Sequence, residues 1–226
     1  MNPKERAGES AVGYIKDGMV VGLGHGSTAK YFIDSLGAAL RERRLNGIKG
    51  IPTSERSAEQ ARQLGIPLTT FAESPVVDVT VDGADEVGPG LNLIKGLGGA
   101  LLREKLVAQN SRKLVIIIGD DAKRVHMLGT AVPLPVEVTR FSHEASEHFL
   151  RGLGCVPALR KGADGSPFVT DNGNYIYDCR FPKIDDPKSL EEKLAHRAGI
   201  VETGLFINMA DVVLLARTDA VETFNR

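Results

Sequence analysis

Short apolar runs alternate with amphipathic segments along the first half of the chain. Apolar runs with β-branched residues predict strands, whereas apolar recurrence at positions i, i+3 and i+4 predicts helices. Because consecutive parallel strands are joined by crossovers that are usually helical, this alternation predicts an α/β fold with a mostly parallel sheet. The expected strands are 19–23, 48–52, 67–71, 76–81 and 113–118, and the expected helices are 4–16, 29–40, 58–64 and 100–110.

Two of these elements carry a pattern that also predicts their burial. The run that ends at Ile118 is continuously apolar, which is typical of a strand buried on both faces. In the helix expected at 100–110, Leu101, Leu102, Leu106 and Ala108 are expected to form the apolar side.

The alternation ends near Val132. The sequence Asp-Asn-Gly-Asn at 171–174 is a turn signal, so the short strands on either side of it are predicted to form a hairpin. The elements expected after Val132 are helices at 142–152 and 187–197 and strands at 155–159, 168–170, 175–179 and 210–217.

The last of these strands is expected to return to the main sheet. We therefore predict a sheet domain formed by residues 1–131 together with 206–226, and a smaller α+β domain inserted at 132–205. Because ligands of such sheets bind at the carboxyl ends of the strands, polar residues that follow a predicted strand are the first candidates for a site.

Composition excludes several classes of function. With 226 residues and a net charge of −1, the chain has no global basic field that would favour nucleic acid or an anionic membrane. No apolar run approaches the roughly 18 residues of a membrane span, and the polar N-terminal stretch lacks the apolar core of a signal peptide, so a cytoplasmic location is expected. The two cysteines form no disulfide or metal-ligand pattern and are expected to be buried or neutral thiols.

A glycine-rich segment follows the first predicted strand. Residues 22–28 read Gly-Leu-Gly-His-Gly-Ser-Thr, and amides at a helix N-terminus with neighbouring hydroxyls favour an anion. The glycine spacing differs from a dinucleotide fingerprint, and the Gly-Lys-Ser/Thr of a P-loop is missing. A single monophosphate fits better, and a tight strand–helix turn is the alternative interpretation.

Three carboxylates follow the strand expected at 76–81. Asp82, Asp85 and Glu86 lie close enough in the sequence to repel one another unless lysine, water or ligand hydroxyls compensate. Helix capping or a solvated turn is the simpler interpretation. Magnesium is a further alternative, but no other acidic cluster or histidine stands at a metal-ligand spacing, so no metal is expected.

A lysine, a glycine cluster and a helical glutamate come next. Lys95 precedes Gly96, Gly98 and Gly99, and Glu104 falls in the second turn of the helix expected at 100–110. Carboxylates beside a lysine and a glycine-rich loop are the groups that proton transfer on an anionic metabolite requires. A surface glutamate paired with lysine at helical spacing is the alternative for Glu104.

The order of these motifs resembles one family. Gly-x-Gly-x-Gly-Ser-Thr, Thr-Ser-x-x-Ser, Asp-Gly-Ala-Asp-Glu, Lys-Gly-x-Gly-Gly-Ala-Leu-x-Arg-Glu-Lys, Pro-Leu-Pro-Val-Glu-Val and Thr-Asp-Asn-Gly-Asn occur in this order in the type A ribose-5-phosphate isomerases. The resemblance runs from about Gly22 to Phe206, and the Asp-Gly-Ala-Asp-Glu and Arg-Glu-Lys pair is its most specific part.

The resemblance implies a cofactor-free interconversion of D-ribose 5-phosphate and D-ribulose 5-phosphate in the pentose phosphate pathway. It implies a Rossmann-like sheet domain with a smaller inserted α+β (ferredoxin-like) domain, and a homodimer or homotetramer. By matching motifs, Glu104 is the proton-transferring base, Asp82 and Asp85 serve ring opening and the substrate hydroxyls, and Lys95 lies near the reacting oxygens. The implied substrate contacts are His25, Gly26, Ser27, Thr28, Gly83, Ala84, Gly96, Leu97, Gly98 and Lys123, with Lys4 at the position of an N-terminal lysine that reaches the site.

Two positions depart from the family pattern. His25 stands where the loop usually has threonine, which replaces a hydroxyl donor by a titratable ring, and Leu97 replaces a frequent glycine. Glu86 is expected to support its loop rather than to react. Two other functions remain open at this point: a non-catalytic sugar-phosphate-binding regulatory domain, and a CoA-transferase-like enzyme on a related fold.

Overall fold

The structure is a computed structural model that describes residues 2–226. It divides into two compact units, which are described separately. The first unit consists of the residues up to Ala84, Arg103–Ala122 and Met209–Arg226, and the second consists of Asp85–Leu102 and Lys123–Asn208. The second unit contains all of the residues 132–205 expected in the small domain, together with flanking segments, and the domain boundaries drawn from the sequence stay a prediction.

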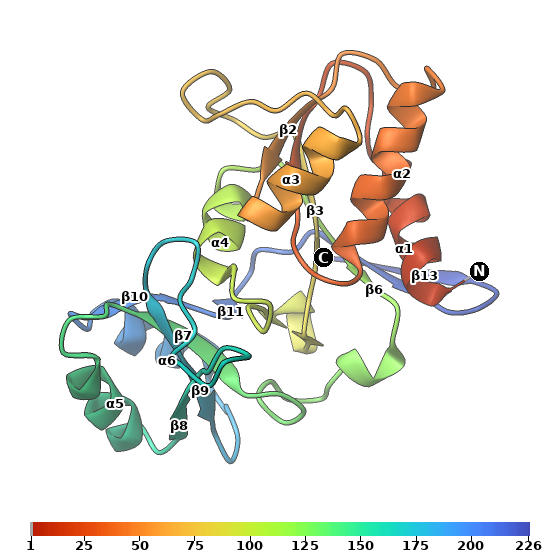
Figure 1. The fold of residues 1–226 in the computed structure, drawn as a ribbon. Helices are drawn as coiled ribbons and strands as arrows, with labels where there is room; N and C mark the ends of the chain where they lie inside the picture. The colour runs from red at the N-terminus through yellow and green to blue at the C-terminus, as the bar shows by residue number, and fades with distance from the viewer. Residues whose placement is uncertain (1) are drawn as a thin grey trace. The chain divides into compact units, whose positions relative to one another are not determined.

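A six-stranded sheet forms the centre of the first unit (Figure 1). Its order is β13-β12-β6-β3-β1-β2, and all neighbouring strands are parallel except β12 and β13. Every residue of β6 and β12 is buried, which confirms the burial predicted for the run ending at Ile118. The strands are β1 (Val20–Leu23), β2 (Lys49–Pro52), β3 (Val79–Gly83), β6 (Leu114–Ile118), β12 (Val212–Ala216) and β13 (Val221–Asn225).

Helices cover both faces of this sheet, as the sequence predicts. α1 and α2 lie side by side (Figure 1) and share one core with α3 and with alternate residues of β1, such as Val21 and Leu23. α4 lies on the opposite face, where Val107 packs with Val20 and Ile51. The helices are α1 (Pro3–Val12), α2 (Ala29–Arg41), α3 (Glu55–Gln63) and α4 (Leu101–Gln109).

The second unit contains two antiparallel sheets. One has the order β10-β7-β9-β8, and the other is a small sheet with the order β11-β5-β4. Its strands are β4 (Glu86–Val87), β5 (Leu93–Ile94), β7 (Leu134–Val138), β8 (Val156–Leu159), β9 (Tyr175–Arg180), β10 (Ile200–Thr203) and β11 (Leu205–Phe206), and its helices are α5 (His143–Gly152), α6 (Pro187–Ala195) and the short 3₁₀ segment η1 (Pro89–Leu91).

Two predicted strands are wrong. Within the described chain, residues 67–71 contribute only an isolated bridge between Gly50 and Leu68. Residues 168–170 form no strand there either, and β9 pairs with β7 and β8 in place of the predicted hairpin. The turn signal itself is confirmed, because the N–H of Thr170 donates to the carbonyl of Asn174 at 2.9 Å.

Both cysteines are buried, as expected from the sequence. A hydrogen bond with Cys155, together with burial, raises the pKa of the Cys179 thiol far above its ordinary value, so this thiol stays protonated. Among residues 2–226, no helix is both long and apolar enough to cross a membrane.

Candidate active site

Asp82 is held at the carboxyl end of β3 by two backbone amides. The residue is 1% exposed, and its Oδ1 accepts the N–H groups of His25 at 3.0 Å and of Gly83 at 2.7 Å. β3 lies between β1 and β6 in the middle of the six-stranded sheet, so the loop after β1 is the neighbour that reaches this carboxylate. These two amide N–H groups fix the orientation of the Asp82 carboxylate.

Glycine is required at two positions beside β3. A Cβ on Gly24 would lie 2.3 Å from Asp82 Oδ1, and a Cβ on Gly22 would lie 1.9 Å from the Thr80 hydroxyl oxygen. The glycines of the predicted anion loop therefore allow the loop to approach β3 closely, and the position of the Asp82 carboxylate depends on that approach.

The His25 ring takes part in a hydroxyl network that the sequence did not predict. Its Nδ1 lies 2.8 Å from Ser54 Oγ, the Ser54 hydroxyl donates to Ser57 Oγ at 2.9 Å, and the Ser57 hydroxyl donates to the Gly24 carbonyl at 2.7 Å. Ser54 also caps α3 by accepting the N–H of Ser57 at 3.0 Å, a role that serine commonly has at a helix N-terminus. The Thr-Ser-x-x-Ser motif thus supports the glycine loop as well as starting a helix.

The loop ends at the start of α2. Lys4 Nζ donates to Ser27 Oγ at 3.0 Å, so Lys4 lies beside the predicted substrate-contact residues. Ser27 is exposed and Gly26 is half-buried with φ 107°, whereas Thr28 is buried at the N-terminus of α2. The first unit therefore brings together Asp82, Gly83 and the loop from His25 to Ser27, and Ala84 follows directly in the chain.

Glu104 is buried on α4, with an exposed fraction of 4%. Lys105 and Val107 are each 2% exposed, whereas Leu106 is 45% exposed. The predicted apolar side of this helix is therefore wrong at Leu106, because the helix buries Glu104 and Lys105. Charged residues are almost never fully buried without a specific role or partner, so this inversion identifies Glu104 as a functional candidate.

Lys95 and Asp85 belong to the second unit. Lys95 is 2% exposed; its N–H donates to the Gly204 carbonyl at 2.9 Å, and its Nζ lies 5.4 Å from the centre of the Phe206 ring. The carboxylate of Asp85 accepts the N–H of Leu97 at 2.9 Å. Asp85 is thereby tied to the loop formed by residues 95–99, in which Leu97 and Gly98 are exposed and Gly96 is buried.

Glu86 has a supporting role, but for the loop of residues 129–132 and not, as the sequence had predicted, for its own loop. It is fully buried, and its carboxylate accepts the N–H groups of Gly129 at 2.6 Å, Ala131 at 2.6 Å and Val132 at 2.8 Å. Lys123 ends the 3₁₀ segment η2 (Asp121–Lys123), where it is half-buried.

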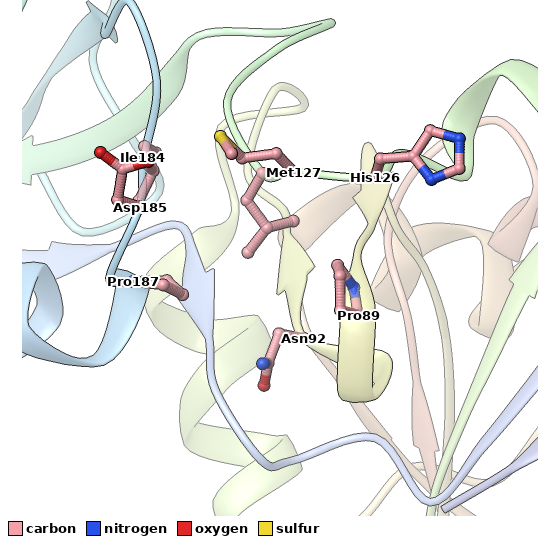
Figure 2. A pocket seen from close by; sticks show the side chains of 8 residues that line it. Pro89, Asn92, His126, Met127, Ile184, Asp185 and Pro187 are labelled. Carbon is pink, nitrogen blue, oxygen red and sulfur yellow. The ribbon is translucent and has the colours of Figure 1, made fainter.

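A pocket of about 220 Å³ in the second unit contains none of the predicted site residues. Its lining side chains are shown in Figure 2 and comprise Pro89, Asn92, His126, Met127, Leu128, Ile184, Asp185 and Pro187. Among residues 2–226, no three His, Cys, Asp or Glu side chains are grouped so as to hold a metal ion.

Comparison with known proteins identifies the family of this chain. Residues 49–220 match the family model of ribose 5-phosphate isomerase A (phosphoriboisomerase A). The chain belongs to the ribose 5-phosphate isomerase A family. It is therefore an aldose–ketose isomerase by family, and the resemblance noted in the motifs is confirmed.

The relatives and solved structures below match this chain over most of their own length. A ribose-5-phosphate isomerase A of Synechococcus sp. is 48% identical over 99% of this chain and 96% of the relative, and a probable ribose-5-phosphate isomerase 2 of Arabidopsis thaliana is 43% identical over 99% and 86%. The solved ribose 5-phosphate isomerase of Plasmodium falciparum has a TM-score of 0.96 at 39% identity, covering 100% of this chain and 99% of the other. A D-ribose-5-phosphate isomerase solved in complex with phospho-erythronic acid has a TM-score of 0.96 at 38% identity, covering 99% and 97%. These likenesses confirm the α/β fold with a mostly parallel sheet and a smaller unit.

Proposed function

We propose that this chain interconverts D-ribose 5-phosphate and D-ribulose 5-phosphate through an enediolate, with Glu104 as the base. Family membership supports the reaction, which belongs to the pentose phosphate pathway. The observation that carries the residue assignment is the burial of two carboxylates, Glu104 at 4% and Asp82 at 1% exposed. Ionisable groups buried at the carboxyl end of a parallel sheet or on an adjoining helix are the usual source of tuned acid–base chemistry.

The reaction needs a base that works at two carbons. In the proposed mechanism the Glu104 carboxylate removes the proton from C2 of the open-chain aldose and returns it to C1, while a hydroxyl proton passes from O2 to O1. A carboxylate in this position contributes about 10²–10⁴-fold to the rate, provided that the reacting carbon is held within its reach.

The other assigned groups act on the oxygens. We assign Asp82 and Asp85 to ring opening and to the sugar hydroxyls, and the Lys95 ammonium to the oxygen on which negative charge develops. His25, Gly26, Ser27, Thr28, Gly83, Ala84, Gly96, Leu97, Gly98 and Lys123 are the proposed substrate contacts. What supports these assignments is the matching of motifs and, within each unit, the hydrogen bonds that connect Asp82 to His25 and Asp85 to Leu97.

The proposed function also has an expected oligomeric state and cellular compartment. We propose a cytoplasmic homodimer or homotetramer that requires no cofactor. Light scattering coupled to size-exclusion chromatography measures the assembly, and a mass equal to that of one chain would contradict it.

A coupled assay for ribulose 5-phosphate formation tests the function. The purified chain is expected to convert ribose 5-phosphate at a rate unchanged by added chelator. Absence of conversion would contradict the isomerase assignment in favour of a non-catalytic sugar-phosphate-binding domain, and loss of activity with chelator would contradict the cofactor-free reaction. A covalent thioester formed with CoA, seen by mass spectrometry, would instead indicate a CoA-transferase.

A further inference from the structure

The loop of residues 95–99 is held in an unusual backbone conformation within the second unit. Gly96 has φ 102° and Gly99 has φ 88°, backbone angles that residues other than glycine rarely adopt. A Cβ on Gly96 would also lie 2.8 Å from the Cβ of Leu101. One internal bond closes the loop, from the N–H of Gly99 to the Gly96 carbonyl at 3.0 Å. One hydrogen bond between residues three apart contributes little net stability. The conformation of the loop therefore depends on contacts from residues outside it.

Arg160 supplies such contacts from the end of β8. Its Nη1 donates to the carbonyl of Gly96 at 3.0 Å and to the carbonyl of Leu97 at 3.1 Å. Its Nε and Nη2 donate to the two carboxylate oxygens of Asp178 on β9, the first at 2.9 Å. The guanidinium therefore joins a strand of the four-stranded sheet to two consecutive peptide groups of the loop.

The geometry of this contact depends on the planar guanidinium. The Arg160 side chain is 11% exposed and that of Asp178 is 23% exposed, so water screens the ion pair only partly. A bidentate Arg–carboxylate pair fixes the orientation of the remaining N–H groups, which here are those that reach the loop.

Phe168 adds a second contact to the same loop. A Cβ on Gly99 would lie 2.6 Å from the Cζ of Phe168, so the ring occupies the space beside this glycine. The Arg160 guanidinium lies 5.9 Å from the centre of the Phe168 ring, and the N–H of Phe168 donates to the Arg160 carbonyl at 2.9 Å. Arg160 and Phe168 thus contact both ends of the Gly96–Gly99 stretch.

We propose that Arg160 is a positioning residue for the isomerase reaction, which sets the backbone of residues 96–98 through its paired bonds to Asp178 and to the Gly96 and Leu97 carbonyls. The proposal rests on the proposed assignment of Lys95 and residues 96–98 to the substrate site. Arg160 itself is not assigned to a reacting atom; it acts through the loop that carries Lys95 and the proposed substrate contacts at residues 96–98.

The test is the variant Arg160→Lys. A lysine keeps a cation beside Asp178, but one ammonium group cannot reproduce the fork that reaches both carbonyls. We expect kcat to fall about tenfold or more, because small misplacement of a positioning group is costly, while KM changes less than about threefold. The Gly99 amide is expected to exchange with solvent faster than in the unaltered chain, at a thermal midpoint close to the unaltered one.

Arg151→Lys is the matched control. Arg151 forms a 2.6 Å ion pair with Glu147 on α5 in the same unit and is not one of the residues that hold the loop. The Arg151→Lys variant is expected to have the same kcat as the unaltered chain. Equal losses in both variants, or an unchanged kcat and unchanged Gly99 exchange in Arg160→Lys, would overturn the positioning role.

Lys95→Met, measured in the same assay, separates this proposal from the site assignment. A fully active Lys95→Met would show that the loop is not part of the site, and the role of Arg160 would fall with it. An inactive Lys95→Met combined with a normal Arg160→Lys would overturn the role of Arg160 alone.

Discussion

The contact between the glycine loop and Asp82 is compatible with a histidine at position 25. The contact that fixes the Asp82 carboxylate comes from the backbone N–H of His25, which any residue except proline provides. The ring points instead to Ser54, 29 positions along the chain. The residue types of this part of the site could be predicted from the sequence, but the partner of His25 could not, since it depends on how β1 and α3 come together.

Gly24→Ala is expected to destabilise the chain and to lower its activity. The added Cβ would lie 2.3 Å from Asp82 Oδ1, and such overpacking costs about 1–3 kcal/mol. Gly152→Ala is the control, because nothing lies within 4 Å of a Cβ at that position in α5. Urea unfolding and kcat of both variants check the prediction. A Gly24→Ala variant as stable and active as the control would contradict the close approach.

α4 shows why the orientation of an element is harder to predict than its existence. The helix expected at 100–110 is present as Leu101–Gln109, but its charged residues Glu104 and Lys105 are buried while Leu106 is exposed. The apolar pattern assigns burial to leucine by default, and α4 departs from that rule at the residue proposed as the base. The wrong strand at 168–170 has a related cause, since the pairing of β9 with β7 and β8 is set by long-range contacts that a local turn signal does not contain.

The two adjacent apolar residues of α4 test this orientation. Val107→Ala is expected to lower the free energy of unfolding by about 1–3 kcal/mol, because Val107 packs with Ile51 and Val77. Leu106→Ala is expected to change it by less than about 0.5 kcal/mol, because the side chain is already exposed. Chemical unfolding of both variants gives the comparison. A larger loss for Leu106→Ala would mean that Glu104 is not on the buried side of the helix.

At the scale of the molecule, the sequence predicts the α/β class and the added smaller unit. The alternation of strands and helices over the first 118 residues gives the fold class, although the strand expected at 67–71 contributes only an isolated bridge. The small sheet of β4, β5 and β11 could not be predicted from the sequence pattern, since strands of two residues are too short to show a period. The proposed site residues are divided between the two units, Glu104 and Asp82 in the first and Lys95 and Asp85 in the second.

On the proposed function, phospho-erythronic acid, the ligand in the solved D-ribose-5-phosphate isomerase that this chain resembles, is expected to stabilise the chain by mass action. A ligand that binds only the folded chain, present at about 100 times its Kd, adds about 2.7 kcal/mol to the free energy of unfolding. Ser27→Ala and Lys123→Ala, one in each unit, are each expected to reduce this shift, whereas Lys183→Ala, which removes an exposed ion pair with Asp185, is expected to preserve it. Thermal unfolding with and without the ligand measures the shifts. Unchanged shifts in both test variants would contradict the proposed substrate contacts.

Turnover by Glu104→Gln is the most direct test of the account. The amide has nearly the same shape as the carboxylate but cannot accept the C2 proton, so kcat in the ribose 5-phosphate assay is expected to fall about 10³-fold or more. Binding of phospho-erythronic acid, measured by calorimetry, is expected to change by less than about threefold, because the base acts on the transition state. Near-normal turnover by this variant would contradict the assignment of Glu104 as the base.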